Sequence, residues 1–281
     1  MRQPRLTPTV KKLEPNPAPF FAWDRKTPQY YRSLRIGADT HLHEQIFSLI
    51  ARVIPPENAG RQSLVVDLGC GEGALAQRLW DAGYSVIGVD KQREAFRAWG
   101  PRFVFADFDR PEEAEGFLSE WMGKVDLVVA VEIIEHLRRP WEFVQLCHKL
   151  ARPGGQLVVT TPNVASWWSR LWFLLRGELW GFGFESWHDP GHVHPFTYVE
   201  LEKLLEEVGF RACGVYLGGC LPVIWGYNWK RFLASLALLP LRPLMGGFRD
   251  GWVLCIHAEK PGIGESLKSS SPRARTLPPS Q

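Results

Sequence analysis

Short apolar runs alternate with helical stripes of apolar residues through the middle of the chain. The runs predict buried strands over residues 64–66, 85–90, 102–107, 125–131 and 156–161. Between them, apolar side chains at helical spacing predict helices over residues 74–82, 92–99, 111–122 and 140–151. A regular alternation of strand and helix is typical of a parallel sheet that is covered by helices on both faces. The pattern therefore indicates the α/β class.

The same kind of pattern continues on both sides of this region. An apolar stripe predicts a helix over residues 39–53. A second helix is expected over residues 197–208, because Thr197 and Glu200 have the spacing of a capping box. The last two strands are expected over residues 210–217 and 252–260.

The two ends of the chain differ in composition from the middle. Residues 1–19 contain five prolines, and residues 261–281 are rich in proline, serine and basic residues. We therefore expect a disordered arm and a disordered tail. Residues 20–260 then form one domain, with two insertions at about 163–196 and 218–250 that are far longer than ordinary loops.

A glycine-rich turn follows the first strand. Asp67 ends that strand, and Gly69, Gly71 and Gly73 precede the helix. Glycines let the backbone touch a ligand, and the free N–H groups of a helix N-terminus favour a nucleotide. The spacing also fits the dinucleotide fingerprint, but Asp67 would then lie close to a pyrophosphate of like charge. A carboxylate at this point suits a cationic ligand, such as an amino group near a sulfonium.

Two further acids end the next two strands. Asp90 ends the second strand about 20 residues after the glycines, where ribose hydroxyls bind in such folds. Asp107 ends the third strand and could accept a hydrogen bond from an adenine amino group. Three acids on three successive strand ends favour S-adenosylmethionine over NAD.

At these residues the sequence resembles class I S-adenosylmethionine-dependent methyltransferases. The resemblance rests on residues 65–73, 86–90, 126–132 and 152–159, which occur in the family's order. It implies a doubly wound, mostly parallel, seven-stranded Rossmann-like sheet with an antiparallel last strand. It also implies S-adenosylmethionine as the cofactor, for which the expected binding residues are Asp67, Gly69, Cys70, Gly71, Asp90, Lys91, Asp107, Val131 and Glu132.

Acidic and imidazole side chains follow the fourth strand, at the edge of the sheet where ligands bind in such folds. In a helical turn, Glu132, Glu135 and His136 would share one face. Two carboxylates and an imidazole can hold a divalent metal. Oxygen ligands favour Mg²⁺, and the imidazole also admits Mn²⁺, Fe²⁺ or Zn²⁺. The alternative is that the glutamate contacts the cofactor and the histidine bonds a neighbouring loop.

This Glu-x-x-Glu-His stretch is similar to that of ubiquinone-biosynthesis O-methyltransferases and of small-RNA 3′-terminal 2′-O-methyltransferases. The second group has a further histidine shortly before a Phe/Trp-Thr pair, and His192 stands in that place here. The resemblance implies a metal set of Glu132, Glu135, His136 and His192. Other methyltransferases have a Glu-His pair after this strand and no metal. In such a metal-free site, His192 or His194 is the candidate base. Glu135 and His136 complete the catalytic candidates.

The two insertions are rich in Trp, of which the chain has 13. The apolar run over residues 232–241 is about half of what a bilayer span needs. Trp229, Lys230 and Arg231 precede it, and such flanks suit a membrane interface. Alternatively, the insertions pack on each other as a lid over an apolar pocket. Both interpretations favour a lipophilic, lipid-linked or aromatic acceptor, whereas RNA would call for a basic stripe that we do not find.

We therefore expect O-methylation of a hydrophobic, aromatic or lipid-linked small molecule. The alternatives are metal-dependent 2′-O-methylation of RNA 3′ ends, and a non-catalytic protein of this fold that docks on membranes or partners. The chain has five cysteines and no Cys-x-x-Cys pair, which indicates reduced thiols. It has no run of about 20 apolar residues. We expect a cytoplasmic protein that could lie peripherally at the inner membrane face.

Overall fold

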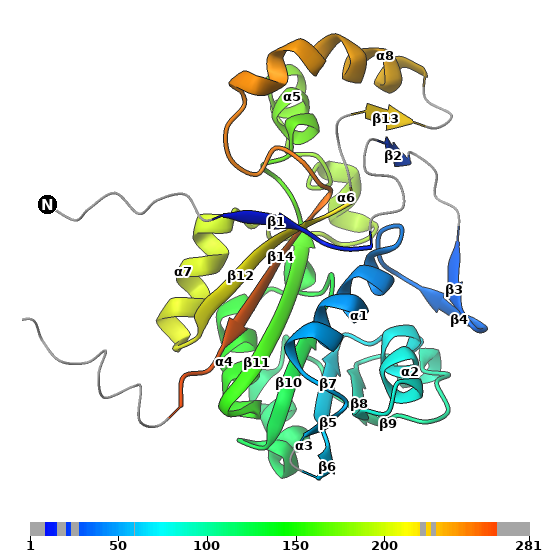
Figure 1. The fold of residues 1–281 in the computed structure, drawn as a ribbon, viewed down its shortest axis with the longest axis vertical. Coiled ribbons are helices and arrows are strands. Elements are labelled where there is room, and N and C mark those ends of the chain that lie inside the picture. Colours follow the sequence, from blue (N-terminus) through cyan, green and yellow to red (C-terminus); the bar gives the residue numbers. More distant parts are fainter. Residues whose placement is uncertain are drawn as a thin grey trace, which may run out of the picture.

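An eight-stranded mixed sheet forms the centre of the molecule (Figure 1). The computed structural model describes residues 9–15, 21–23, 28–58, 60–219, 223–225 and 229–262. The strand order is β1–β12–β14–β11–β10–β7–β8–β9. In chain order these strands are Val10–Lys12 (β1), Leu64–Leu68 (β7), Ser85–Asp90 (β8), Arg102–Phe105 (β9), Val125–Ala130 (β10), Ala151–Pro162 (β11), Arg211–Gly218 (β12) and Val253–Glu259 (β14).

The sheet is parallel except around one strand. β14 runs antiparallel to both of its neighbours, β11 and β12, and every other neighbouring pair in this sheet is parallel. The expected Rossmann-like α/β sheet with an antiparallel last strand is thus confirmed. Because β7 to β11 run in the same direction, their carboxyl ends meet at one edge, and the loops that leave this edge build the candidate site.

Helices cover both faces, as a doubly wound fold requires. Residues of α1 and α2 share a core cluster with Val65 of β7, whereas residues of α3, α4 and α7 share a second cluster with Val66 and Leu68. Adjacent strand residues point to opposite faces, so one apolar strand contributes to both cores. The helices are Leu42–Val53 (α1), Ala74–Asp81 (α2), Pro111–Leu118 (α3), Pro140–Leu150 (α4) and Tyr198–Val208 (α7).

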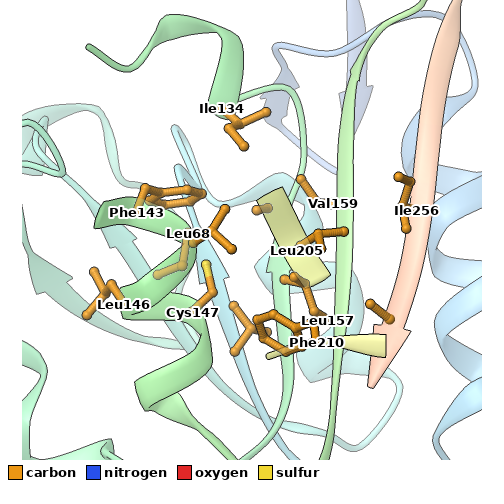
Figure 2. Close-up of a cluster of buried hydrophobic side chains, with 14 of the residues drawn as sticks. Leu68, Ile134, Phe143, Leu146, Cys147, Leu157, Val159, Leu205, Phe210 and Ile256 are labelled. Atoms are coloured by element: carbon orange, nitrogen blue, oxygen red, sulfur yellow. The ribbon is translucent and has the colours of Figure 1, made fainter. Parts of the chain in front are cut away.

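Figure 2 shows part of the second core. Phe143, Leu146 and Cys147 of α4 lie with Leu205 of α7 and Leu157 of β11. All five side chains are almost fully buried. This packing fixes α4 against the sheet, and the loop between β10 and α4 is fixed with it.

The eighth strand is a correction to the sequence analysis, which placed residues 1–19 in a disordered arm. β1 lies inside that segment and pairs in parallel with β12, with Val10 opposite Val215. Leu13 follows the strand, donates its N–H to the carbonyl of Leu217 at 2.9 Å and is fully buried. The strand satisfies backbone groups that the edge strand β12 would otherwise expose, and Leu13 adds apolar burial. Residues 1–8, 16–20 and 263–281 lie outside the described residues.

A second correction concerns residues 92–99, for which a helix is expected. The structure has only a 3-10 turn, Arg93–Ala95 (η1). The N–H of Arg97 donates to the carbonyl of Glu72, and the N–H of Trp99 donates to Gln77 Oε1. Since these donors are taken by the neighbouring α2 segment, they cannot extend a helix.

Other element boundaries shift by a few residues. The helix expected from residue 39 begins at Leu42, because His41 has a positive φ of 63°. The helix expected over 111–122 ends at Leu118 and continues as a 3-10 turn, Ser119–Trp121 (η2). The capping residue Thr197 is confirmed, since its side chain accepts a hydrogen bond from the N–H of Glu200.

The two insertions pack on each other at the carboxyl end of the sheet (Figure 1). Trp167 and Trp168 of the first insertion share a small buried cluster with Ile224 of the second. No helix within the described residues has the length and apolar character needed to cross a bilayer. The remaining elements are Phe21–Trp23 (β2), Gln29–Tyr31 (β3), Leu34–Ile36 (β4), Glu57–Asn58 (β5), Arg61–Gln62 (β6), Ile134–His136 (η3), Trp167–Arg176 (α5), Phe184–His188 (α6), Val223–Trp225 (β13), Trp229–Leu238 (α8) and Leu239–Leu244 (η4).

Candidate active site

The glycine turn between β7 and α2 leaves space on one side and touches protein on the other. Gly69, Gly71 and Gly73 all have positive φ, of 80°, 53° and 87°. A Cβ on Gly69 would lie 2.8 Å from Cγ1 of Ile133, so that only glycine fits there. A Cβ on Gly71 would meet no described atom within 4 Å. The turn therefore presents bare backbone to an open space, as a nucleotide site requires.

Asp67 and Asp90 lie beside this turn and differ in how they are satisfied. The N–H groups of Gly71 and Gln92 both donate to the carboxylate of Asp90, each at 2.9 Å. Asp67 is buried, and among the described residues its Oδ2 has no hydrogen-bond partner. Burial, and then the negative charge of Asp90, raise the pKa of Asp67 to about 7. A buried acid with an unused oxygen is suited to a cationic ligand.

The other expected cofactor residues surround the same turn. Cys70 is half-buried, and burial raises the pKa of its thiol. Lys91 is exposed directly after β8, and Val131 is half-buried after β10. Asp107 accepts a hydrogen bond from the N–H of Asp109 at 3.1 Å, which shapes the loop after β9. Their contacts with a cofactor remain predictions.

Glu132 is held in an unusual backbone conformation. Its φ is +50°, its N–H donates to Oγ1 of Thr160 at 2.9 Å, and Thr160 donates back to its Oε1 at 2.8 Å. Burial, and next the charge of Asp39, raise the pKa of Glu132 to about 8, and burial raises the pKa of Asp39 to about 6. Sequence reasoning missed Thr160 and Asp39. Two adjacent threonines, Thr160 and Thr161, end the otherwise apolar strand β11, and this polar pair could have indicated a contact with the site.

Glu135 is fully buried within the 3-10 turn η3. Neither of its carboxylate oxygens makes a hydrogen bond of normal geometry among the described residues, although the Thr161 side chain and the backbone N–H of Glu135 lie near enough to lower its pKa. Burial, and next the charge of Glu132, hold the pKa of Glu135 well above its usual value. Burying such a group costs several kcal/mol unless something compensates it, so its place here requires an explanation.

Two imidazoles lie against Glu135. His136 Nε2 is 3.9 Å from Glu135 Oε1, and the ring centroids of His136 and His192 are 4.8 Å apart. Nδ1 of His136 is 3.2 Å from the carbonyl of Gly191, and Nδ1 of His192 is 2.7 Å from that of Gly181. Since a carbonyl can only accept, both Nδ1 atoms carry a proton, and in the neutral rings both Nε2 atoms keep a lone pair. Burial lowers the pKa of each histidine, which favours the neutral form.

The expected four-residue metal set is reduced to three. Glu135, His136 and His192 offer ligand atoms that all lie within 4.8 Å of one another, and the described residues hold this one group of the kind. Glu132 was expected on the same helical face, but it precedes the 3-10 turn and its carboxylate bonds Thr160. The helical spacing therefore does not hold for Glu132.

His194 has a different place from the one expected. Its Nδ1 is 2.8 Å from the carbonyl of Leu137, and its ring stacks on Phe196. The N–H groups of Val193 and His194 both donate to the carbonyl of Glu135. His194 thus anchors the loop before α7 to η3, outside the three-residue group.

Comparisons with known proteins identify relatives of this chain. Residues 38–213 match the sequence family described as a methyltransferase domain. A ubiquinone biosynthesis O-methyltransferase of Caulobacter vibrioides is 34% identical over 102 residues, 35% of this chain and 40% of that protein. A Mycolicibacterium smegmatis protein with the name "Probable S-adenosylmethionine-dependent methyltransferase" is 32% identical over 179 residues, 63% of this chain and 62% of that protein. The chain thus covers less than two thirds of these relatives.

Solved structures show the same fold. The crystal structure of an S-adenosylmethionine-dependent methyltransferase from Archaeoglobus fulgidus superposes with a TM-score of 0.54, at 22% identity over 78% of this chain and 94% of that one. The sheet order, the glycine turn beside Asp67 and Asp90, and the family match over residues 38–213 lead to one conclusion. This chain belongs to the class I S-adenosylmethionine-dependent methyltransferases.

Proposed function

We propose that this methyltransferase methylates a hydroxyl oxygen on a hydrophobic small molecule. The observation that carries the proposal is the group of Glu135, His136 and His192, which lies after the carboxyl end of β10. Two neutral imidazoles with unprotonated Nε2 atoms can accept a proton, and the transfer of a methyl group to a hydroxyl must release one. The names of the ubiquinone biosynthesis relatives support an oxygen acceptor.

The residues of the glycine turn fit S-adenosylmethionine. The unpartnered oxygen of Asp67 favours a positive charge, and the open space beside Gly71 admits a ligand against the backbone. When it is bound, the cofactor supplies a methyl group on a positively charged sulfur. Asp90 keeps the turn in shape by accepting the N–H of Gly71.

The histidine group would act on the acceptor. The carbonyls of Gly191 and Gly181 fix the two rings with Nε2 directed away from those carbonyls. A hydroxyl within hydrogen-bond reach of either Nε2 could pass its proton to that ring. The buried Glu135 would then offset the charge of the imidazolium.

The same group fits a divalent cation, because a carboxylate oxygen of Glu135 and one ring nitrogen of each histidine lie within 4.8 Å of one another. Glu135, His136 and His192 would hold the ion, and a mixed set of oxygen and nitrogen donors admits Mn²⁺, Fe²⁺ or Zn²⁺ as well as Mg²⁺. When it is bound, such an ion lowers the pKa of a hydroxyl that approaches it.

Aromatic side chains beside the histidines support a hydrophobic acceptor. The ring centroid of Phe182 lies 5.2 Å from that of His192. Phe184 and Trp187 of α6, which leads into the His192 loop, are exposed. An aromatic or prenylated acceptor would bury these surfaces.

The test is methyl transfer from labelled S-adenosylmethionine to a prenylated catechol, with short RNA as a second acceptor. We expect His192→Ala and Glu135→Gln to reduce turnover at least about 100-fold, while calorimetry finds S-adenosylmethionine affinity unchanged. His188→Ala is the matched control, because His188 is exposed on the same insertion. Full turnover by His192→Ala would contradict the proposal. Loss of turnover after chelation, with recovery on adding Mg²⁺ or Mn²⁺, would assign the group to a metal, and chelator-resistant turnover would assign it to a base.

A further inference from the structure

Both insertions expose apolar side chains on their outer side. We call the exposed apolar surface of α5, α8 and η4 the insertion face; its most exposed members are Phe173, Leu174, Leu175, Trp229, Leu233 and Leu244. Leu174 is 80% exposed and Leu244 is 83% exposed. Single exposed leucines are ordinary, but a cluster of them over three adjoining elements marks an interaction surface.

Helix α8 exposes a row of apolar side chains. Trp229, Leu233 and Leu236 stand at positions i, i+4 and i+7, which lie on one side of a helix, and all three are exposed. The buried residue of this helix is polar: Ser235 accepts the N–H of Ile224 at 3.2 Å and donates to the carbonyl of Phe232. On the side that faces the protein, Ala234 and Leu238 pack against the buried cluster of Trp167, Trp168 and Ile224, so α8 is apolar there as well. Since a helix normally turns polar residues toward water, the exposed apolar row of α8 suits an apolar environment.

The charges on this surface have one sign. Residues 167–176 and 229–244 contain the cations Arg170, Arg176, Lys230, Arg231 and Arg242 and no Asp or Glu. Arg176 and Lys230 are exposed at the border of the insertion face. Arg242 is already paired with Asp250, which leaves Arg176 and Lys230 as the exposed cations of these segments. A second copy of this chain, packed face to face, would bring these like charges together. An anionic surface would be complementary.

We propose that the insertion face docks on a bilayer surface that contains anionic lipids. The ten-residue helix α8 would lie in the plane of the interface, with its leucines at the boundary of the acyl chains and Trp229 at headgroup level. Arg176 and Lys230 would meet the anionic headgroups. The docked face lies at the carboxyl end of the sheet (Figure 1), the same end as the histidine group, so that a membrane-dissolved acceptor would have a short path to it.

This docking is separate from the proposed function, because it requires no methyl transfer. The test is co-sedimentation of the full chain with vesicles of phosphatidylcholine, with and without 30 mole per cent of phosphatidylglycerol, about a third of the lipid. We expect binding to the anionic vesicles that weakens as salt rises. The double variant Leu233→Ser/Leu236→Ser should bind at least about tenfold more weakly, because two exposed leucines no longer enter the lipid.

Two controls keep the result specific. Phe117→Ser removes an apolar side chain that is 51% exposed on α3, away from the insertions, and should bind like the wild type. The variant Lys230→Gln should bind the anionic vesicles more weakly than the wild type, and its binding to phosphatidylcholine vesicles should be unchanged. Circular dichroism and the S-adenosylmethionine affinity check that each variant is folded. Equal sedimentation of wild type and double variant, or a wild-type dimer that the double variant abolishes without any vesicle binding, would overturn the proposal.

Discussion

Asp67 and Glu135 are buried carboxylates, and Oδ2 of Asp67 and both oxygens of Glu135 make no hydrogen bond of normal geometry among the described residues. At the residue scale, burying these oxygens without a hydrogen-bond donor destabilises the folded protein unless a ligand compensates them. Each lies in a place where a ligand could compensate it: a cationic cofactor beside Asp67, and an imidazolium or a metal ion beside Glu135. Both residues were candidates from the sequence, but their lack of partners became visible only in three dimensions.

We expect S-adenosylmethionine to bind more tightly as the pH rises from 6 to 8. Burial and Asp90 raise the pKa of Asp67 to about 7, so the anionic form that a sulfonium compound favours is a minority below that pH. The dissociation constant from calorimetry should fall about tenfold over this range. Asp67→Asn cannot titrate, and its profile isolates the titration of the ligand's own amino group. Parallel profiles for wild type and variant would contradict this assignment.

At the scale of elements, two glycines in the turn between β7 and α2 have different roles. Gly69 packs against Ile133 of the loop after β10, which couples the turn to η3, whereas Gly71 borders open space. This contact brings the glycine turn and the Glu-x-x-Glu-His stretch, which lie far apart in the chain, into one site. The sequence predicted both segments but could not show their contact.

Substitution of these two glycines should separate folding from binding. Gly69→Ala would strain a φ of +80° and press a methyl group to 2.8 Å from Ile133, so we expect a loss of about 2–3 kcal/mol in unfolding free energy. Gly71→Ala should cost about 1 kcal/mol, yet weaken S-adenosylmethionine binding at least tenfold by filling the open space. Urea denaturation and calorimetry measure the two effects. Wild-type affinity in Gly71→Ala would show that the cofactor lies elsewhere.

At the scale of the whole molecule, the two ends of the sheet have different roles. The carboxyl end carries the glycine turn, the histidine group and both insertions. Toward the other end, Asp126 of β10 is fully buried and paired with Arg61 and Arg152, at 2.6 Å each. Although burial raises it, the pKa of Asp126 is lowered by the hydrogen bonds from these two arginines. Its oxygens are thus satisfied, in contrast to Oδ2 of Asp67 and the two oxygens of Glu135.

Asp126→Asn should therefore destabilise the protein without changing the site. The substitution removes the charge that pairs with two partly exposed arginines and weakens their hydrogen bonds, and we expect a loss of about 1–2 kcal/mol in unfolding free energy. The affinity for S-adenosylmethionine, measured below the unfolding transition, should stay within about twofold of wild type. A large change in affinity at unchanged stability would contradict this division between the two ends.

The sequence by itself determined the α/β class, most strand and helix ranges and the glycine turn, because apolar periodicity and turn chemistry act over a few residues. It also marked Glu135, His136 and His192 as candidates. Only the tertiary structure decided that these three converge while Glu132 bonds Thr160 and His194 bonds Leu137. It also decided that β1 extends the sheet and that α8 exposes a row of apolar side chains. These outcomes depend on contacts between residues far apart in the chain, which no local pattern encodes.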